Sequence, residues 1–211
     1  MQKGLIPLDE RKIEPLKEDL VAVPSLNPNK PIYLARPVAN LAIDLVKEAR
    51  AAGFKHPYFS IGSGYRTIKS QEKKWKDALI KYGSPEKADD YVARPGRSSH
   101  HTGFAFDIFL GYSFNSEDIE KIKKGRAYKY MRDHLGPKYN LTQLRSEPWH
   151  WECNEECRNK YVRYAMYRDG IMNARVSDLR SAGLILNSHF VLTFGAIAGL
   201  GFLAKHIRDK G

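Results

Sequence analysis

An apolar run near the middle of the chain constrains the fold more than any other feature, because a carboxylate interrupts it. The run FAFDIFL at residues 104–110 is typical of a β-strand, with Asp107 at its centre. Side chains alternate along a strand, so Asp107 shares its face with Ala105 and Phe109. A buried carboxylate is unfavourable unless a cation or a hydrogen-bond donor meets it. We therefore expect either a metal ion or an arginine beside Asp107.

Two further segments supply residue types that metal hydrolases use. His100 stands seven residues before Asp107, and Gly103 lets the chain turn sharply between them. The segment EPWHWE then places Glu147 three residues before His150. A zinc hydrolase needs three protein ligands, an open position for water and a base that takes the water proton. A histidine with a carboxylate three positions away supplies the third ligand and the base together.

The segment SGYRTIKSQ at residues 63–71 carries a candidate for binding a carboxylate. An arginine that follows a strand beside a glycine can meet a carboxylate with two parallel hydrogen bonds. We expect Arg66 to bind the terminal carboxylate of a peptide substrate, with Gln71 on the first turns of the following helix. The alternative is a structural arginine on a turn. Trp149 and Trp151 flank His150 and either line the site or fill the core, and we expect core filling for at least one of them.

The rest of the pattern predicts an α+β domain. Apolar residues recur at helical spacing over residues 37–50 and 68–82, and we expect Trp75, Leu79 and Tyr82 to face inward. Strands are expected at residues 58–63 and in PWHWEC, and one or two helices at residues 115–136, capped near Ser116. We assign residues 35–168 to this domain.

Two flanking segments differ from the domain in composition. Residues 1–32 contain five prolines and many charges, which predicts an extended arm over residues 1–34 and not a core element. Residues 169–211 are predicted to form an apolar helical tail, whose uninterrupted run of 15 residues is shorter than the roughly 20 of a membrane span. The alternatives for this tail are a helix in an assembly interface, a membrane anchor, and a helix that completes the domain core.

Composition limits the classes of partner and compartment. The chain has 211 residues, 42% of them hydrophobic and 28% charged, as in a soluble globular protein. Its net charge of +11 favours anionic partners, although a solvated basic surface is the alternative. No nucleic-acid-binding signature accompanies the charge, so we expect no specific nucleic acid. The first residues lack the apolar region of a secretory signal peptide. Cys153 and Cys157 are expected to be structural, with a labile disulfide as the alternative.

Taken together, the motifs resemble the VanY-type D-Ala-D-Ala carboxypeptidases. The resemblance covers about residues 35–165 and rests on the order S-x-H-x-x-G-x-A-x-D at residues 98–107, on EPWH at 147–150 and on SGYR at 63–66. These enzymes belong to the LAS-type metallopeptidases, which include phage endolysins and share a fold with lysostaphin and hedgehog domains. The resemblance therefore implies a compact domain with a small antiparallel sheet and flanking helices.

The resemblance also implies roles for individual residues. It implies that Zn²⁺ is bound by His100, Asp107 and His150, and that Glu147 is the general base. The spacing of the family selects His100 over His101, which we expect to support the site or to be exposed. The residues expected to contact the substrate are Arg66, Gln71, Ser98 and Trp149.

The expected function is zinc-dependent hydrolysis of D-alanine-containing peptidoglycan stem peptides, by a D,D- or L,D-carboxypeptidase at the cell wall. One alternative is an endopeptidase similar to the endolysins. Another is a structural component of a phage tail or secretion device, to which the arm and the tail would bind. The presence of all four catalytic positions argues against an inactive domain. A serine hydrolase is excluded for Ser63, because GSG lacks the spacing of a nucleophile elbow.

Overall fold

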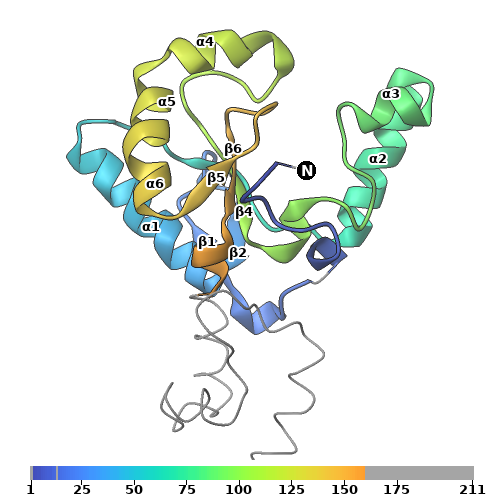
Figure 1. Ribbon diagram of the computed structural model, residues 1–211, viewed down its shortest axis with the longest axis horizontal. Helices are drawn as coiled ribbons and strands as arrows, with labels where there is room; N and C mark the ends of the chain where they lie inside the picture. Colours follow the sequence, from blue (N-terminus) through green and yellow to red (C-terminus); the bar gives the residue numbers. More distant parts are fainter. Residues whose placement is uncertain (1, 13, 160–211) are drawn as a thin grey trace, which may run out of the picture. The chain divides into compact units, whose positions relative to one another are not determined.

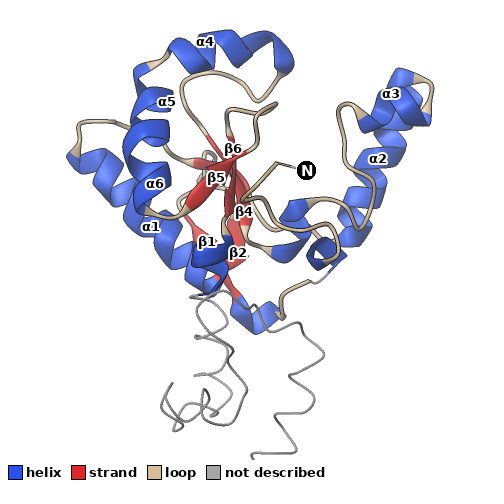
Figure 2. Ribbon diagram, in the orientation of Figure 1, coloured by secondary structure: helices blue, strands red, loops and turns tan. Residues whose placement is uncertain are grey.

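A four-stranded antiparallel sheet in the order β3-β4-β6-β5 forms the centre of the computed structural model, which describes residues 2–12 and 14–159 (Figures 1 and 2). Its strands are β3 (Ile61–Ser63), β4 (Ala105–Ile108), β5 (Leu141–Gln143) and β6 (His150–Cys153). All residues of β4 and β6 are buried, which explains the apolar run that contains β4, whereas β6 also buries the polar side chains of His150 and Glu152. The expected α+β fold with a small antiparallel sheet is confirmed.

Helix α1 (Arg36–Ala51) supplies the largest apolar helix face of the fold. It begins with Pro37 in its first turn, where proline is tolerated because the N–H groups there have no helical partner. The helix expected at residues 37–50 is therefore confirmed. Its buried side chains recur at helical spacing: Val38, Ala39, Ala42, Leu45, Val46 and Ala49.

Helix α2 (Ile68–Tyr82) has the bounds expected from the sequence, but its buried face differs from the prediction. Its fully buried residues are Gln71 and Ala78, whereas Trp75, Leu79 and Tyr82 are only half-buried. The reason is that α2 packs against the short helix α3 (Pro85–Asp89) and its flanking loop, away from the sheet (Figure 1). The Tyr82 ring, for example, stacks on Tyr91 with 4.2 Å between ring centroids.

The segment between β4 and β5 is helical, as expected, but consists of more pieces. Its elements are η4 (Ser116–Asp118), α4 (Ile119–Lys124), α5 (Arg126–Tyr130), the π-helical turn η5 (Met131–Leu135) and α6 (Gly136–Lys138). The cap is Asn115, one residue before the expected Ser116, and its side chain accepts a hydrogen bond from the N–H of Asp118.

The N-terminal arm contains regular structure that the sequence analysis did not predict. It forms the 3₁₀ turns η1 (Glu10–Lys12) and η2 (Lys17–Asp19) and an antiparallel hairpin of β1 (Leu20–Val23) and β2 (Ile32–Ala35). Its side chains Leu5 and Ile6 are 6% and 1% exposed. The expectation that the arm contributes no core element is therefore wrong. The prolines were misleading because all five lie outside the two strands.

The two cysteines are joined by a disulfide. Cys153 ends strand β6, and Cys157 follows it by four residues. The apolar tail expected at residues 169–211 lies outside the described residues. Among the residues that the structure describes, no helix combines the length and apolar character needed to span a membrane.

Candidate active site

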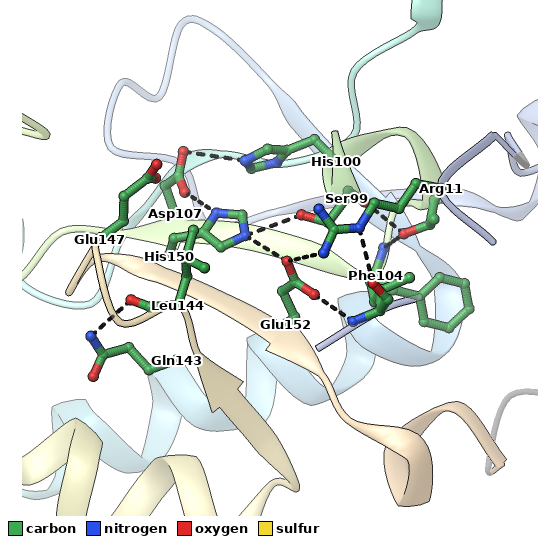
Figure 3. Close-up of polar contacts among 12 residues, drawn as sticks. Arg11, Ser99, His100, Phe104, Asp107, Gln143, Leu144, Glu147, His150 and Glu152 are labelled. Carbon is green, nitrogen blue, oxygen red and sulfur yellow. Dashed lines mark hydrogen bonds and ion pairs between the residues drawn. The ribbon is translucent and has the colours of Figure 1, made fainter. Parts of the chain in front are cut away.

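Asp107 and His150 meet because β4 and β6 place them directly opposite each other. The antiparallel register pairs Asp107 with His150, and on the other side of β4 it pairs Asp107 with Ser63. Residues opposite each other in an antiparallel pair project from the same face of the sheet. Nδ1 of His150 consequently lies 2.8 Å from Oδ1 of Asp107 (Figure 3).

His100 reaches the same carboxylate from the 3₁₀ turn η3 (Ser99–Thr102), just before β4. The turn ends at Gly103 with φ +68°, and a Cβ at Gly103 would lie 2.9 Å from the backbone nitrogen of Ala35. Glycine is therefore required there by both its backbone conformation and the close approach of β2. The turn places Nε2 of His100 3.5 Å from Oδ2 of Asp107.

The three side chains form a group that fits a divalent metal ion. One ligand atom from each of His100, Asp107 and His150 lies within 4.8 Å of the others, and all three residues are buried. Nδ1 of His100 lies 2.8 Å from the carbonyl oxygen of Gly64, so this nitrogen donates and Nε2 is left as the ligand atom. Two imidazoles and one carboxylate are a donor set typical of a catalytic zinc site with an open position.

The charges of the site favour a bound cation. Burial alone would lower the pKa of His150, but hydrogen bonds to Asp107 and Glu152 outweigh it and raise this pKa to about 10. Burial alone would raise the pKa of Asp107, but the two histidines hold it well below its usual range. Burial lowers the pKa of His100. An ionised carboxylate and neutral imidazoles are the forms that bind metal, so a cation would replace the proton of His150.

Glu147 lies beside this group, in the turn that leads into β6. The backbone N–H of His150 donates to the carbonyl of Glu147 at 3.0 Å. This bond closes a turn that holds the two residues close together in space. The indole N–H of Trp149 donates to Oε2 of Glu147 at 3.1 Å, and Figure 3 shows this carboxylate next to Asp107. Burial raises the pKa of Glu147, although the charge of His150 opposes the effect. The predicted base is thus near the predicted ligands, and Trp149 orients it.

Arg66 lies in the turn between β3 and α2, with its guanidinium held in place by two side chains. Its Nη1 donates to Oε1 of Gln71 at 2.7 Å, and its Nη2 donates to Oγ of Ser63 at 2.9 Å. Burial lowers the pKa of Arg66, while the charges of Asp107 and Glu147 act in the opposite direction, so both carboxylates lie close enough to interact with the guanidinium. The structure therefore brings Arg66 to the same site.

Gln71, Ser98 and Trp149, the other residues predicted to contact substrate, are all buried. The amide of Gln71 is 1% exposed and is engaged on both sides, because its Nε2 also donates to the carbonyl of Ala93 at 2.6 Å. In this structure Gln71 orients Arg66 by accepting its hydrogen bond. Ser98 is 5% exposed and occupies the N-cap position of η3, two residues before His100, without a side-chain capping hydrogen bond. Their contact with a substrate stays a prediction.

Three polar residues of the site were not assigned a contact from the sequence. Nε2 of His150 lies 3.1 Å from Oγ of Ser99 and 3.2 Å from Oε1 of Glu152. His101 is fully buried, where its ring links the carbonyl of Arg66 to the backbone N–H of Gly96. Of these, Glu152 had a usable signal, since it stands two residues after His150 on the same strand and so on the same face.

Comparison with known proteins agrees with this geometry. A D-alanyl-D-alanine carboxypeptidase of Enterococcus faecalis (strain ATCC 700802 / V583) is 29% identical over 119 residues, which are 51% of this chain and 43% of that protein. The YodJ protein of Bacillus subtilis (strain 168) is 29% identical over 127 residues, or 56% of this chain and 45% of that protein. The chain spans less than half the length of these curated relatives.

The fold is also found among solved structures. The LdcB LD-carboxypeptidase superposes with a TM-score of 0.55 and 24% sequence identity, over 74% of this chain and 75% of that one. This similarity concerns the fold. Residues 31–154, more than half of the chain, match the VanY family of D-alanyl-D-alanine carboxypeptidases. The chain therefore belongs to the VanY family of enzymes, as its motifs predicted.

Proposed function

We propose that this protein is a zinc-dependent carboxypeptidase that removes the C-terminal D-alanine from peptidoglycan stem peptides. The observation that carries the proposal is the convergence of His100, Asp107 and His150 on one point, with the charges of Glu147 and Arg66 close enough to interact with this group. Family membership and the relative named D-alanyl-D-alanine carboxypeptidase support the choice of substrate.

His100, Asp107 and His150 would hold the zinc ion through two ring nitrogens and one carboxylate oxygen. Zinc supplies Lewis-acid chemistry, which polarises a carbonyl and lowers the pKa of a water molecule to about 7. Hydrogen bonds fix the two histidines on the ring nitrogen opposite the ligand atom: the carbonyl of Gly64 holds His100, and the carboxylate of Glu152 holds His150. Such partners keep the rings in the tautomer and orientation that binding requires.

Glu147 would act as the general base and then as the general acid. Its carboxylate would accept the proton of the attacking water and pass it to the amine of the departing D-alanine. Its half-buried position raises the carboxyl pKa, which makes it a better proton acceptor than an ordinary glutamate. The indole of Trp149 would hold the carboxylate in place during both transfers.

Arg66 would bind the terminal carboxylate that defines a carboxypeptidase substrate. A guanidinium has five N–H donors, and the bonds to Gln71 and Ser63 fix its plane while the remaining donors can meet a carboxylate. Lys74 on α2 interacts with Arg66, Asp107 and Glu147 through its charge, so a second cation lies close by. This concentration of positive charge is what an anionic peptide end requires.

The scissile bond can be identified from the products. The zinc-loaded protein would be incubated with a synthetic stem pentapeptide ending in D-Ala-D-Ala, with the tetrapeptide ending in one D-Ala, and with purified peptidoglycan. Release of free D-alanine, identified by mass, is expected from the pentapeptide for a D,D-enzyme and from the tetrapeptide for an L,D-enzyme. Release of larger stem fragments without free D-alanine would contradict the proposal and favour the endopeptidase alternative.

We further propose that the protein acts at the bacterial cell wall, where this substrate is found. The sequence also suggested delivery by a phage tail or secretion device, through the arm and the apolar tail, and that suggestion rests on the sequence alone. Mass spectrometry of purified phage or secretion particles is the appropriate test. Recovery of the protein with tail or baseplate components would support the assembled setting, and its consistent absence from such particles would contradict it.

A further inference from the structure

Glu152 is a buried carboxylate placed directly behind the metal-binding group. Its side chain is 1% exposed, and its Oε1 lies 3.2 Å from Nε2 of His150. The opposite ring nitrogen of His150, Nδ1, is the one that faces Asp107. Figure 3 shows this line of contacts from Asp107 through the His150 ring to Glu152. A carboxylate that accepts the distal N–H of a ligating imidazole fixes the ring and increases its basicity.

The groups that hold Glu152 come from the N-terminal arm, more than 140 residues away in sequence. The backbone N–H of Ile6 donates to Oε2 of Glu152 at 2.6 Å. The guanidinium of Arg11 lies 3.6 Å from Oε1 of the same carboxylate, with its side chain 14% exposed. A buried carboxylate needs such partners because burial without them costs several kcal/mol.

Arg11 is itself fixed on two further sides. Its Nε donates to the carbonyl of Ile6 at 2.9 Å, and its Nη1 donates to the carbonyl of Arg97 at 3.1 Å. Arg97 immediately precedes the segment that carries Ser98 and His100, so Arg11 links the arm, β6 and the turn that supplies another ligand. The buried side chains of Leu5 and Ile6 anchor this part of the arm in the domain.

We propose that Glu152 and Arg11 are positioning residues for the metal centre: the arm brings Arg11 and the Ile6 N–H to Glu152, which holds the His150 ring with Nδ1 toward the metal. The arm thereby helps to position a metal ligand. This inference rests on the proposed zinc centre and adds to it a dependence of metal affinity on Glu152 and on Arg11, which lies far from the family motifs in sequence. Arg11 acts through Glu152 and His150, without touching substrate.

Metal affinity is the measurement that tests the proposal. The dissociation constant of Zn²⁺ would be measured by competition with a chromophoric chelator for the wild type, Glu152→Gln, Arg11→Ala and Arg11→Lys. We expect Glu152→Gln to bind Zn²⁺ about 10- to 100-fold more weakly, since loss of such a partner typically has an effect of that size. Arg11→Ala should weaken binding several-fold, and Arg11→Lys should recover part of the loss because it keeps the charge.

A matched control separates positioning from general damage to the arm. Glu10→Gln alters the neighbouring residue of η1, which pairs with Arg158 at 3.4 Å, and it should leave Zn²⁺ affinity unchanged. The electronic spectrum of the Co²⁺-substituted protein should change in Glu152→Gln and Arg11→Ala but not in Glu10→Gln, because it reports ligand geometry. If Glu152→Gln fails to fold, the two Arg11 variants carry the test.

The outcomes distinguish this inference from the function on which it rests. A wild type that binds Zn²⁺, with Arg11→Ala and Glu152→Gln binding it equally well and giving the same Co²⁺ spectrum, would overturn the inference and leave the proposed function standing. A wild type that binds no Zn²⁺ would contradict the proposed function itself. Weakened binding in both variants, with partial recovery in Arg11→Lys, is the result we expect.

Discussion

The site has two halves that are built differently. The metal half consists of His100, Asp107 and His150, which are 6%, 9% and 4% exposed and are held by two paired strands and a 3₁₀ turn. The arginine half consists of Arg66 and Gln71, carried by a turn and the first turns of α2, with Arg66 half-buried. Side-chain hydrogen bonds hold Arg66, whereas backbone pairing positions Asp107 against His150.

This difference predicts different responses to mutation. Ligand atoms that are fixed by strand register have little freedom to adjust, so loss of one ligand should abolish metal binding. The arginine half depends on several hydrogen bonds to side chains, so its changes should be graded and should appear mainly in substrate binding.

Replacement of a ligand should have the largest effect. His100→Ala removes one of three ligands, and we expect Zn²⁺ content to fall from about one per chain to near zero, with hydrolysis at background. Elemental analysis of the purified protein measures the content. His134→Ala, on an exposed histidine of η5, is the matched control. Full zinc content in His100→Ala would remove His100 from the ligand set.

Replacement of the base should separate chemistry from metal binding. Glu147→Gln keeps the shape of the side chain but removes the proton acceptor, so kcat should fall about 10²- to 10⁴-fold at unchanged zinc content. Glu120→Gln, at an exposed glutamate of α4, should behave as the wild type. A kcat within threefold of the wild type in Glu147→Gln would show that another group accepts the proton.

A substitution in the arginine half should act mainly on KM. Arg66→Lys keeps the positive charge but loses the planar pair of donors, so kcat/KM should fall about 10- to 100-fold with zinc content unchanged. Arg132→Lys provides a control, because Arg132 is exposed and pairs with its neighbour Asp133. Loss of zinc from Arg66→Lys would contradict the separation of the two halves.

The arm also supports the arginine half, through Glu14. Oε1 of Glu14 accepts hydrogen bonds from the Tyr65 hydroxyl at 2.9 Å and from the N–H of Ile68, in the first turn of α2, at 3.0 Å. We expect Glu14→Ala to lower the free energy of unfolding by about 1 kcal/mol, as loss of a helix-capping acceptor does, and to raise KM only slightly. Denaturant unfolding and steady-state kinetics measure both. An unchanged unfolding midpoint would mean that the contact contributes nothing.

The smallest effect is a pH dependence of stability. Burial and the hydrogen bond to Glu14 raise the pKa of Tyr65 to about 12, from an ordinary value of 10.0. The folded state then keeps this proton to higher pH than the unfolded state, so the free energy of unfolding should decrease as pH rises from about 10 to about 12. Tyr65→Phe should show a smaller decrease than the wild type. Equal decreases in both proteins would assign the effect to other groups, such as Tyr139, whose pKa is also raised to about 12.

The metal half could be predicted from the sequence because the features that indicate its residues lie within a few positions of them in the chain. Asp107 interrupts an apolar strand, Gly103 marks the turn after His100, and Glu147 stands at a fixed offset from His150. Strand alternation and turn chemistry convert such spacings into geometry. The bounds of helix α2 follow from its apolar spacing, and the structure adds that Thr67 caps its start and that Gly83 ends it with φ +80°.

The supporting contacts could not be predicted because they join distant parts of the chain. The bonds from Ile6 and Arg11 to Glu152 depend on how the arm docks, and the prolines of the arm gave the opposite indication. The prediction of which residues of α2 face inward was wrong because α2 packs against α3, which buries a different side of the helix. Hydrophobic periodicity shows that a helix has a buried face but does not identify its partner.

The most direct test of the central claim is a zinc titration of the metal-free protein. Protein stripped by a chelator would be supplied with increasing Zn²⁺, and release of free D-alanine from the stem peptides would be measured at each step. We expect no release without metal and a rise in proportion to Zn²⁺ that saturates at about one ion per chain. Release of D-alanine that persists after the metal has been removed would contradict it.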